Sequence, residues 1–274
     1  MENRPLSRAP LWGGVVILLA FGLCSLFPDW LAPHRLGEMF RPWQGPGGVH
    51  LLGTNDMGSD LATELVYAAR STLTVGCCAA AVSLLLGSLL GLLSGWHKGW
   101  LGDGLDLLTN IFLLIPLLPA AIVTAALLGP GMVNLILVIG LLGWCGTARA
   151  VRAQVQKLRR SVFVESLLLL GLPRWRILFR HLLPNLAPVI FSRFVLSVSA
   201  CIMTEATLSF LGLGDPTRPT WGGMVSMAYQ RGGFARGAVW WFAAPGLCIL
   251  LTTLAFGMIG HYFEQKGRMV EGDG

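Results

Sequence analysis

The stretch LLLGSLLGLLSG, from Leu84 to Gly95, places glycines at positions 87, 91 and 95 inside an apolar run. Residues four apart lie on one face of a helix, and a face without side chains lets a second helix backbone approach closely. We therefore expect a tight helix contact along this stretch. Glycine is also common in membrane helices without such a role, and the sequence leaves that alternative open.

Composition indicates an integral membrane protein, because 54% of the 274 residues are hydrophobic and 12% are charged. The net charge of +6 does not indicate nucleic-acid binding, since the basic residues lie between apolar runs, as in cytoplasmic loops. All six cysteines fall in apolar runs, with no CxxC and no nearby histidine at metal-ligand spacing, so we expect free buried thiols and no metal site. The first apolar run has no small-residue cleavage site and is interpreted as a signal anchor.

Five stretches of the sequence, called windows below, contain no Asp, Glu, Lys or Arg, and a membrane-spanning helix needs ~20 apolar residues. The third window is too long for one helix and contains GPGM at 129–132, which favours a turn between two helices. The fourth becomes a full span when it is extended to Leu186–Leu211. Six membrane helices are therefore expected. The windows are Ala9–Pro28, Ser71–His97, Leu107–Ala148, Phe194–Thr204 and Gly237–Phe263.

Loop charges predict the orientation. With the N-terminus inside, thirteen Lys and Arg residues fall in cytoplasmic pieces and six in outer pieces, which favours two cytoplasmic termini. The expected divisions are a cytoplasmic N-terminus (1–8), a first helix (9–28), a periplasmic segment (29–70), a five-helix core (71–263) with a cytoplasmic hairpin (149–185) and a periplasmic loop (212–236), and a cytoplasmic tail (264–274).

The cytoplasmic hairpin is basic yet rich in Leu, Trp, Ile and Phe. A short helix over 163–170 would end at Gly171, which can adopt the left-handed conformation, and a second helix would begin near Pro173. Its apolar residues recur at helical spacing. These are Trp175, Leu178, Phe179, Leu182 and Leu183. The pattern alone leaves two readings open, an amphipathic hairpin on anionic lipid or one that docks on a cytoplasmic protein.

Glu165, Gly171 six residues later, and HLLPN at 181–185 together resemble the EAA loop of permease subunits of bacterial ATP-binding-cassette importers. The resemblance implies that the hairpin enters a cleft of an ATPase subunit. Ser166 and Leu167 stand where that family usually has alanines, which makes the first helix bulkier.

Further stretches are similar to the dipeptide, oligopeptide and nickel branch of these permeases. Ser59, Glu64 and His261 depart from the branch, where two arginines and an aspartate are usual. The similar stretches are LLGTNDMGSDLATELVYAARSTL (51–73), EATLSFLGLGDPTRPTWGGM (205–224) and APGLCILLTTLAFGMIG (244–260).

This resemblance implies an all-α, six-helix permease of the type I importer fold in the bacterial inner membrane, which transports by alternating access. The chain lacks a GxxxxGK[ST] phosphate-binding loop, so it is not expected to be an enzyme or to carry a cofactor, and ATP and Mg²⁺ would belong to partners. The implied partners are a homologous second permease, two ATPase subunits, a periplasmic solute-binding protein and the lipid bilayer. Short peptides and nickel or other metal chelates both remain possible substrates.

Candidate site residues fall into three groups. The coupling group is Glu165, Gly171, Arg174, Trp175, Leu178 and Phe179; the pathway or gating group is Glu205, Arg193 and Phe210; the binding-protein docking group is Asp56, Asp60 and Trp221. For Glu205 a structural tie to the following loop is the favoured alternative, and for Arg193 a side chain that snorkels to the membrane surface.

Two other classes of membrane protein fit the sequence less well. An intramembrane enzyme would need grouped catalytic residues, but the chain has no HExxH or GxSxG motif, and its histidines are scattered over loops and helix ends. A channel or secondary carrier independent of ATP would use the basic hairpin only as a lipid anchor. The five histidines are His34, His50, His97, His181 and His261.

Overall fold

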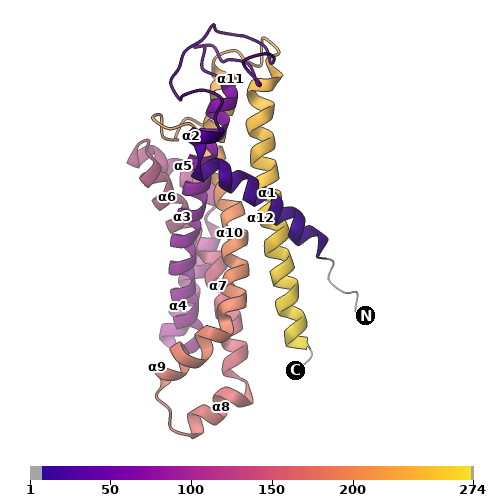
Figure 1. The fold of residues 1–274 in the computed structure, drawn as a ribbon. Coiled ribbons are helices and arrows are strands. Elements are labelled where there is room, and N and C mark those ends of the chain that lie inside the picture. The colour runs from indigo at the N-terminus through magenta and orange to yellow at the C-terminus, as the bar shows by residue number, and fades with distance from the viewer. Residues whose placement is uncertain (1–7, 273–274) are drawn as a thin grey trace.

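The structure is a computed structural model that describes residues 8–272, with the side chains described as far as residue 266. Residues 1–7, which include Arg4, and residues 273–274 lie outside the described part. The helices form an elongated bundle, with the irregular segment 32–60 at one end and α8 and α9 at the other (Figure 1). The elements are α1 (Ala9–Leu26), α2 (Pro28–Leu31), α3 (Leu61–Trp96), α4 (Trp100–Leu114), α5 (Leu117–Leu128), α6 (Met132–Leu142), α7 (Cys145–Arg159), α8 (Val162–Leu169), α9 (Arg174–Arg176), the π-helical turn η1 (Ile177–Leu182), α10 (Leu183–Phe210), α11 (Trp221–Gln230) and α12 (Val239–Gly272).

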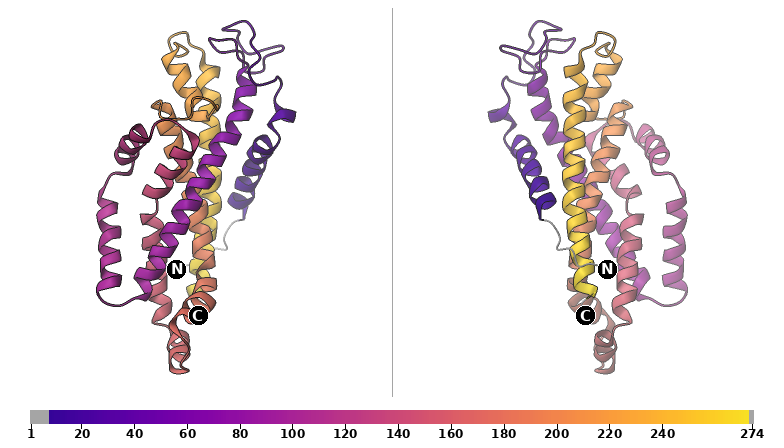
Figure 2. Two further views of the ribbon diagram at one scale, coloured as in Figure 1. Left: turned by 90° about the vertical axis from the view of Figure 1, so that its left-hand side faces the viewer. Right: turned by 90° about the vertical axis from the view of Figure 1, so that its right-hand side faces the viewer.

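Among the described residues, five helices or continuous helix runs are long and apolar enough to cross a membrane, and the bent pair α4–α5 brings the number to six. The turn expected at 129–132 separates α5 from α6, as predicted. The sequence analysis did not foresee that α4 and α5 meet at an angle of 85°. Pro116 explains this bend, because proline has no N–H and keeps the preceding residue, Ile115, out of the helical conformation. Helix α4 lies at the edge of the bundle (Figure 2).

Helix α3 begins at Leu61, earlier than the expected Ser71. The Asp60 side chain accepts a hydrogen bond of 2.8 Å from the Thr63 N–H and so caps the first turn. A window free of charges could not reveal these turns, because Glu64 and Arg70 lie within them. With 36 residues, α3 is longer than the ~20 residues that a bilayer core requires. Its first turns therefore extend beyond the apolar layer.

The charged segment that follows the third window is also largely helical. Residues 149–159 continue α7, and residues 174–210 form one helical run that leads directly into α10. The hairpin is consequently shorter than predicted, and its second arm is the start of a membrane helix rather than a separate element.

The close helix contact predicted at the glycine repeat is confirmed, and α7 is the partner. A Cβ atom added at Gly87 would lie 2.6 Å from the carbonyl oxygen of Trp144, and one at Gly91 would lie 2.5 Å from that of Ala148. At Gly95 an added Cβ would meet the Cβ of Val155 at 2.8 Å. The two backbones therefore approach so closely that only glycine fits along this face of α3.

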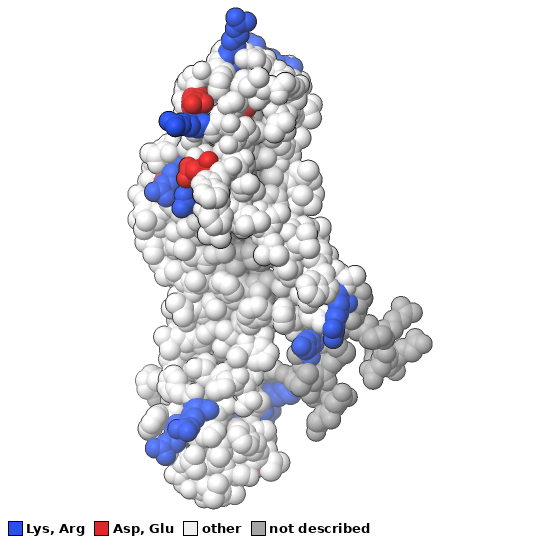
Figure 3. Space-filling model, viewed as in Figure 1, with Lys and Arg blue, Asp and Glu red and all other residues white. Residues whose placement is uncertain are grey.

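Charged side chains gather at the two ends of the bundle, and the face drawn in Figure 3 has an uncharged band between them. The hairpin and the segment 32–60 lie at opposite ends (Figure 1), which fits loops on opposite sides of a membrane. Which end faces the cytoplasm remains a prediction from the loop charges.

We expect Gly91→Ala to lower the free energy of unfolding by ~1–3 kcal/mol, because the added methyl would have to displace the α7 backbone. Gly257→Ala is the matched control, since a Cβ there meets no atom within 4 Å. Reversible unfolding of the purified protein in mixed micelles measures both. Equal stability of the two variants would contradict the packing argument.

Candidate functional site

The hairpin turns at Gly171. Its φ of +75° lies in the left-handed region, and its N–H donates to the carbonyl of Leu168 at 3.0 Å. The N–H of Leu172 donates to the carbonyl of Leu167 at 3.2 Å, so the pair of bonds closes the end of α8. The predicted glycine turn is thus present, and a side chain at this position would add backbone strain.

The base of the hairpin packs on the C-terminal parts of α3 and α7. Leu178 is 5% exposed and lies, with Ile177 and Leu182, in a cluster of buried apolar residues. The other members come from α3, α7, α8 and α10. They are Leu92, Trp96, Val151, Val155, Val164 and Leu186. Leu178 therefore anchors the hairpin to the chain's own helices, and its side chain is not at the surface.

The outer face of the hairpin is apolar and exposed. Trp175 is 63% exposed and Phe179 is 54% exposed, and Leu169 and Leu170 beside the turn are exposed as well. The guanidinium carbon of Arg176 lies 5.5 Å from the centre of the Trp175 ring. The helical spacing thus predicted a single ridge of apolar side chains on the second arm of the hairpin. In the structure, some of these side chains are buried against the bundle and the others are exposed.

A basic cavity of about 820 Å³ lies between the hairpin and the C-terminal ends of α3 and α7. Glu165 is exposed on α8 and contributes to its wall. The Arg159 guanidinium donates to the carbonyl of Trp96 at 2.9 Å, and Arg152 forms an ion pair with Asp106 of α4. The remaining basic residues of the wall are Lys98, Arg160 and Arg174.

Glu205 is fully buried where α10 meets α3 and the start of α11. The Ser209 hydroxyl donates to its Oε1 at 2.6 Å, the Thr72 and Thr220 hydroxyls lie beside the same carboxyl group, and Oε2 has no hydrogen-bond partner. The neighbours of this carboxyl are hydroxyl groups from α3, from α10 and from the residue before α11. This arrangement favours a structural tie between these segments over a position on an open pathway.

Arg193 and Phe210, the other pathway candidates, lie towards opposite ends of α10. Arg193 is partly exposed and faces Glu264 of α12 across 3.7 Å, and Glu264 also lies 3.6 Å from His261. The Phe210 ring lies 6.1 Å from that of Tyr229, and its carbonyl accepts a hydrogen bond from Ser226 at 2.6 Å. Both residues therefore join α10 to a neighbouring helix.

Only one of the three docking candidates is at the surface. Asp56 pairs with Arg231 at 3.1 Å and so joins the segment 32–60 to the loop after α11. Asp60 is buried as the cap of α3. Trp221 is buried too, and its indole N–H donates to the carbonyl of Leu65 at 3.1 Å.

Asp215 is a connecting residue that the sequence analysis did not single out. It accepts hydrogen bonds from the Thr217 hydroxyl at 2.6 Å and from the Met132 N–H at 3.3 Å, and so joins the loop after α10 to the start of α6. The Thr217 hydroxyl holds the pKa of the Asp215 carboxyl below its usual range.

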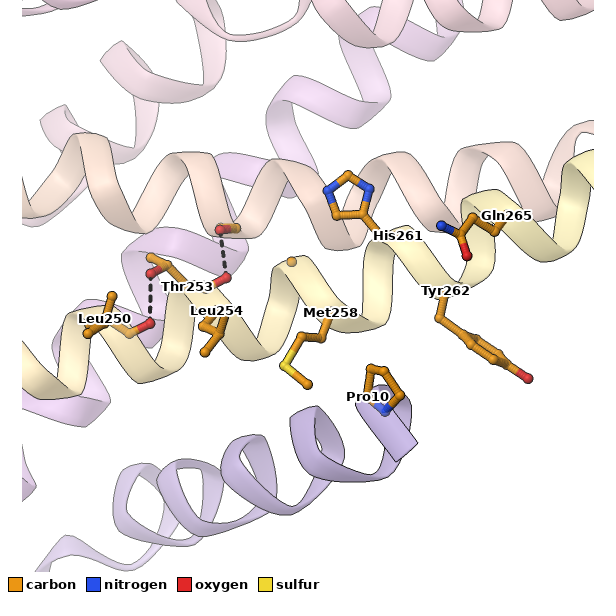
Figure 4. A pocket seen from close by; sticks show the side chains of 10 residues that line it. Pro10, Leu250, Thr253, Leu254, Met258, His261, Tyr262 and Gln265 are labelled. Atoms are coloured by element: carbon orange, nitrogen blue, oxygen red, sulfur yellow. Dashed lines mark hydrogen bonds between the residues drawn. The ribbon is translucent and has the colours of Figure 1, made fainter. Parts of the chain in front are cut away.

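An apolar groove of about 680 Å³ lies between the start of α1 and the second half of α12 (Figure 4). Pro10 and Met258 face each other across it, and His261 and Tyr262 line its far end. Ser199 of α10 donates to the carbonyl of Thr253 at 3.0 Å, which fixes α12 beside α10 behind the groove.

Comparison with known proteins agrees with this architecture. Residues 87–268 match the family of binding-protein-dependent transport system inner membrane components, which covers more than half of the chain. The chain is 34% identical over 257 residues to the di/tripeptide transport system permease protein of Pseudomonas aeruginosa (90% of this chain, 84% of the relative). It is 36% identical over 251 residues to the dipeptide transport system permease protein of Alkalihalophilus pseudofirmus (90% and 81%). It is 31% identical over 251 residues to the glutathione transport system permease protein of Pectobacterium atrosepticum (90% and 82%).

The chain therefore belongs to the family of binding-protein-dependent transport system inner membrane components. It is a multi-pass inner-membrane permease subunit of the ATP-binding-cassette importer class. The resemblance seen in the EAA-like loop and in the three longer stretches is confirmed.

We expect Glu205→Ala to lower the free energy of unfolding by ~2–4 kcal/mol, because it leaves a cavity and removes the acceptor of the Ser209 hydroxyl. Glu205→Gln preserves size and an acceptor oxygen, and should cost less than ~1 kcal/mol and retain uptake. Thermal unfolding of the purified permease and solute uptake by cells measure the two effects. Loss of uptake in a stable Glu205→Gln variant would instead place the carboxylate on the pathway.

Proposed function

We propose that this permease, with a second homologous permease, forms the pathway by which short peptides enter the cell. Two ATPase subunits would bind and hydrolyse ATP with Mg²⁺, and a periplasmic solute-binding protein would deliver the peptide. The family's name and the peptide and glutathione permeases among the relatives support this proposal. Nickel, which the sequence left open, does not occur in the names of these relatives.

The hairpin is the proposed contact with the ATPase. The observation that supports it is the division of the hairpin into a buried base around Leu178 and an apolar outer face with Trp175 and Phe179 exposed. A rigid base transmits a displacement, and an exposed aromatic face suits a protein groove from which charged residues are depleted. Glu165 and Arg174 would supply polar contacts at the margin of that face.

The helical run 174–210 gives this contact a path into the membrane. Its first turns carry the exposed face, and its last turns carry Glu205 and the loop at the outer end. A push or pull on the hairpin would therefore tilt α10 as one rod, and with it the α3–α7 pair on which the hairpin packs. Such a rigid-body movement is one way in which access could alternate between the two sides.

The proposed orientation places the hairpin and both termini in the cytoplasm and the segment 32–60 in the periplasm. This orientation is supported by the loop charges, since the chain segments on the hairpin's side contain thirteen Lys and Arg residues and those on the opposite side contain six. Asp56 and the loop that contains Arg231 would then form part of the surface that receives the binding protein.

If the outer face of the hairpin binds the ATPase, Trp175→Ala combined with Phe179→Ala should lower ATPase co-purification and uptake at least ~10-fold. The reason is that the variant lacks two aromatic side chains that the ATPase would bury on binding. Trp100→Ala is the matched control, because Trp100 is exposed just beyond the inner end of α3 and lies outside the hairpin. Full co-purification and uptake with the double variant would contradict the proposed contact, as would an equal loss in Trp100→Ala.

The substrate can be tested in cells that lack other peptide importers. Expression of this chain with its ATPases, second permease and binding protein should support uptake of a radiolabelled dipeptide, and an excess of unlabelled dipeptide should compete. Accumulation of ⁶³Ni without dipeptide uptake would transfer the proposal to a metal chelate.

A further inference from the structure

The segment 32–60 joins α2 to α3 through turns and isolated bridges rather than regular helices. Connections of this length without secondary structure are uncommon and need ties of their own. The segment contains no cysteine, so a disulfide cannot supply them. Two histidines and one aspartate, however, converge at the point where it meets α3.

These residues are His34, His50 and Asp60, and one ligand atom of each lies within 4.8 Å of the others. His50 is 6% exposed and Asp60 is 3% exposed. His50 Nδ1 lies 2.9 Å from Asp60 Oδ1, while Asp60 Oδ2 accepts hydrogen bonds of 2.8 Å from both the N–H and the hydroxyl of Thr63. The carboxylate is thus held in place by the first turn of α3.

His34 has two further contacts that orient it. Its backbone N–H donates to the Thr63 hydroxyl oxygen at 3.2 Å, and its Nε2 lies 3.2 Å from the carbonyl oxygen of Val49. Because a carbonyl only accepts, Nε2 is the donor in this contact, and in the neutral ring Nδ1 is then the nitrogen that can bind a metal ion. A second-shell carbonyl of this kind commonly orients a metal-bound histidine. Nδ1 faces the Glu38 carboxylate across 4.0 Å.

An aromatic wall closes one side of the cluster. The Phe40 ring lies 4.8 Å from that of His34 and 4.5 Å from that of His50. An apolar shell around imidazole and carboxylate ligands limits access of water to a bound cation. The cluster therefore combines fixed ligands, an orienting carbonyl and a partly dry environment.

We propose that His34, His50 and Asp60 form a site for a divalent transition-metal ion of the zinc type, with Glu38 as a fourth ligand at its exposed side. Two imidazoles with carboxylate oxygens suit Zn²⁺ and its neighbours Co²⁺ and Ni²⁺, and binding would release to solvent the proton that His50 Nδ1 shares with Asp60 Oδ1. The ion would fasten the segment 32–60 to the start of α3 and so order the surface around Asp56. This role does not depend on which solute is transported, and it departs from the expectation that the chain holds no metal site.

The test uses the assembled transporter in lipid nanodiscs, purified with a tag that contains no histidine and treated with EDTA. Equilibrium dialysis against ZnCl₂ should load one more equivalent of zinc on the wild type than on the His34→Gln/His50→Gln double variant. Each single variant removes a direct ligand and should weaken this binding at least ~10-fold, the lower bound for loss of an outer-shell partner. Co²⁺ in place of Zn²⁺ should give visible absorption bands in the wild type that the double variant lacks.

His97→Gln is the control, because His97 lies at the opposite end of α3 and should leave zinc binding unchanged. His34→Gln is the variant that separates metal loss from misfolding, because the His34 ring is partly exposed. Without metal, its thermal midpoint should equal that of the wild type. With zinc, it should lack the increase in thermal midpoint that the wild type shows. Equal zinc loading of the wild type and the double variant would overturn the proposal, as would an equal loss in His97→Gln. In that case the His50–Asp60 contact is a hydrogen bond alone.

Discussion

The close approach of α3 and α7 is the constraint on which the rest of the structure depends. Gly87, Gly91 and Gly95 remove the side chains from one face of α3, and the α7 backbone occupies the space. In a membrane, where lipid is as apolar as leucine, such close packing is a main source of helix association. The hairpin rests on the C-terminal end of this pair, because Leu92 and Trp96 of α3 and Val151 and Val155 of α7 form one buried cluster with Ile177 and Leu178.

Helix α3 also holds together the end of the molecule opposite the hairpin. Its cap, Asp60, holds the irregular segment through His50, and the Thr72 hydroxyl accepts a hydrogen bond from the backbone N–H of Trp221 at 3.2 Å. Trp221 packs edge-on against Phe21 of α1 with ring centres 5.2 Å apart. One long helix therefore packs against the hairpin at one end, the buried Glu205 region, and the segment 32–60 at the other end.

Membership in the importer permease family gives this arrangement a functional setting. The hairpin has a surface that suits a protein partner, while the long run 174–210 and α3 reach from that surface to the opposite end. The residues proposed for coupling and docking fall at the two ends, and the residues between them pack helices together. A bundle that transmits movement in the proposed way needs rigidity along its length more than chemistry within it.

The sequence by itself determined the membrane class, the number of apolar segments, the turn at 129–132, the glycine contact and the Gly171 turn. Each of these features depends on local composition or on the spacing of a few residues, and both are visible in the sequence. Only the tertiary structure decided that Pro116 bends a span, that Leu178, Asp60 and Trp221 are buried, and that His34 and His50 meet Asp60. Burial depends on which distant segment covers a face, as when α11 covers Leu65, and no periodicity within one helix contains that information.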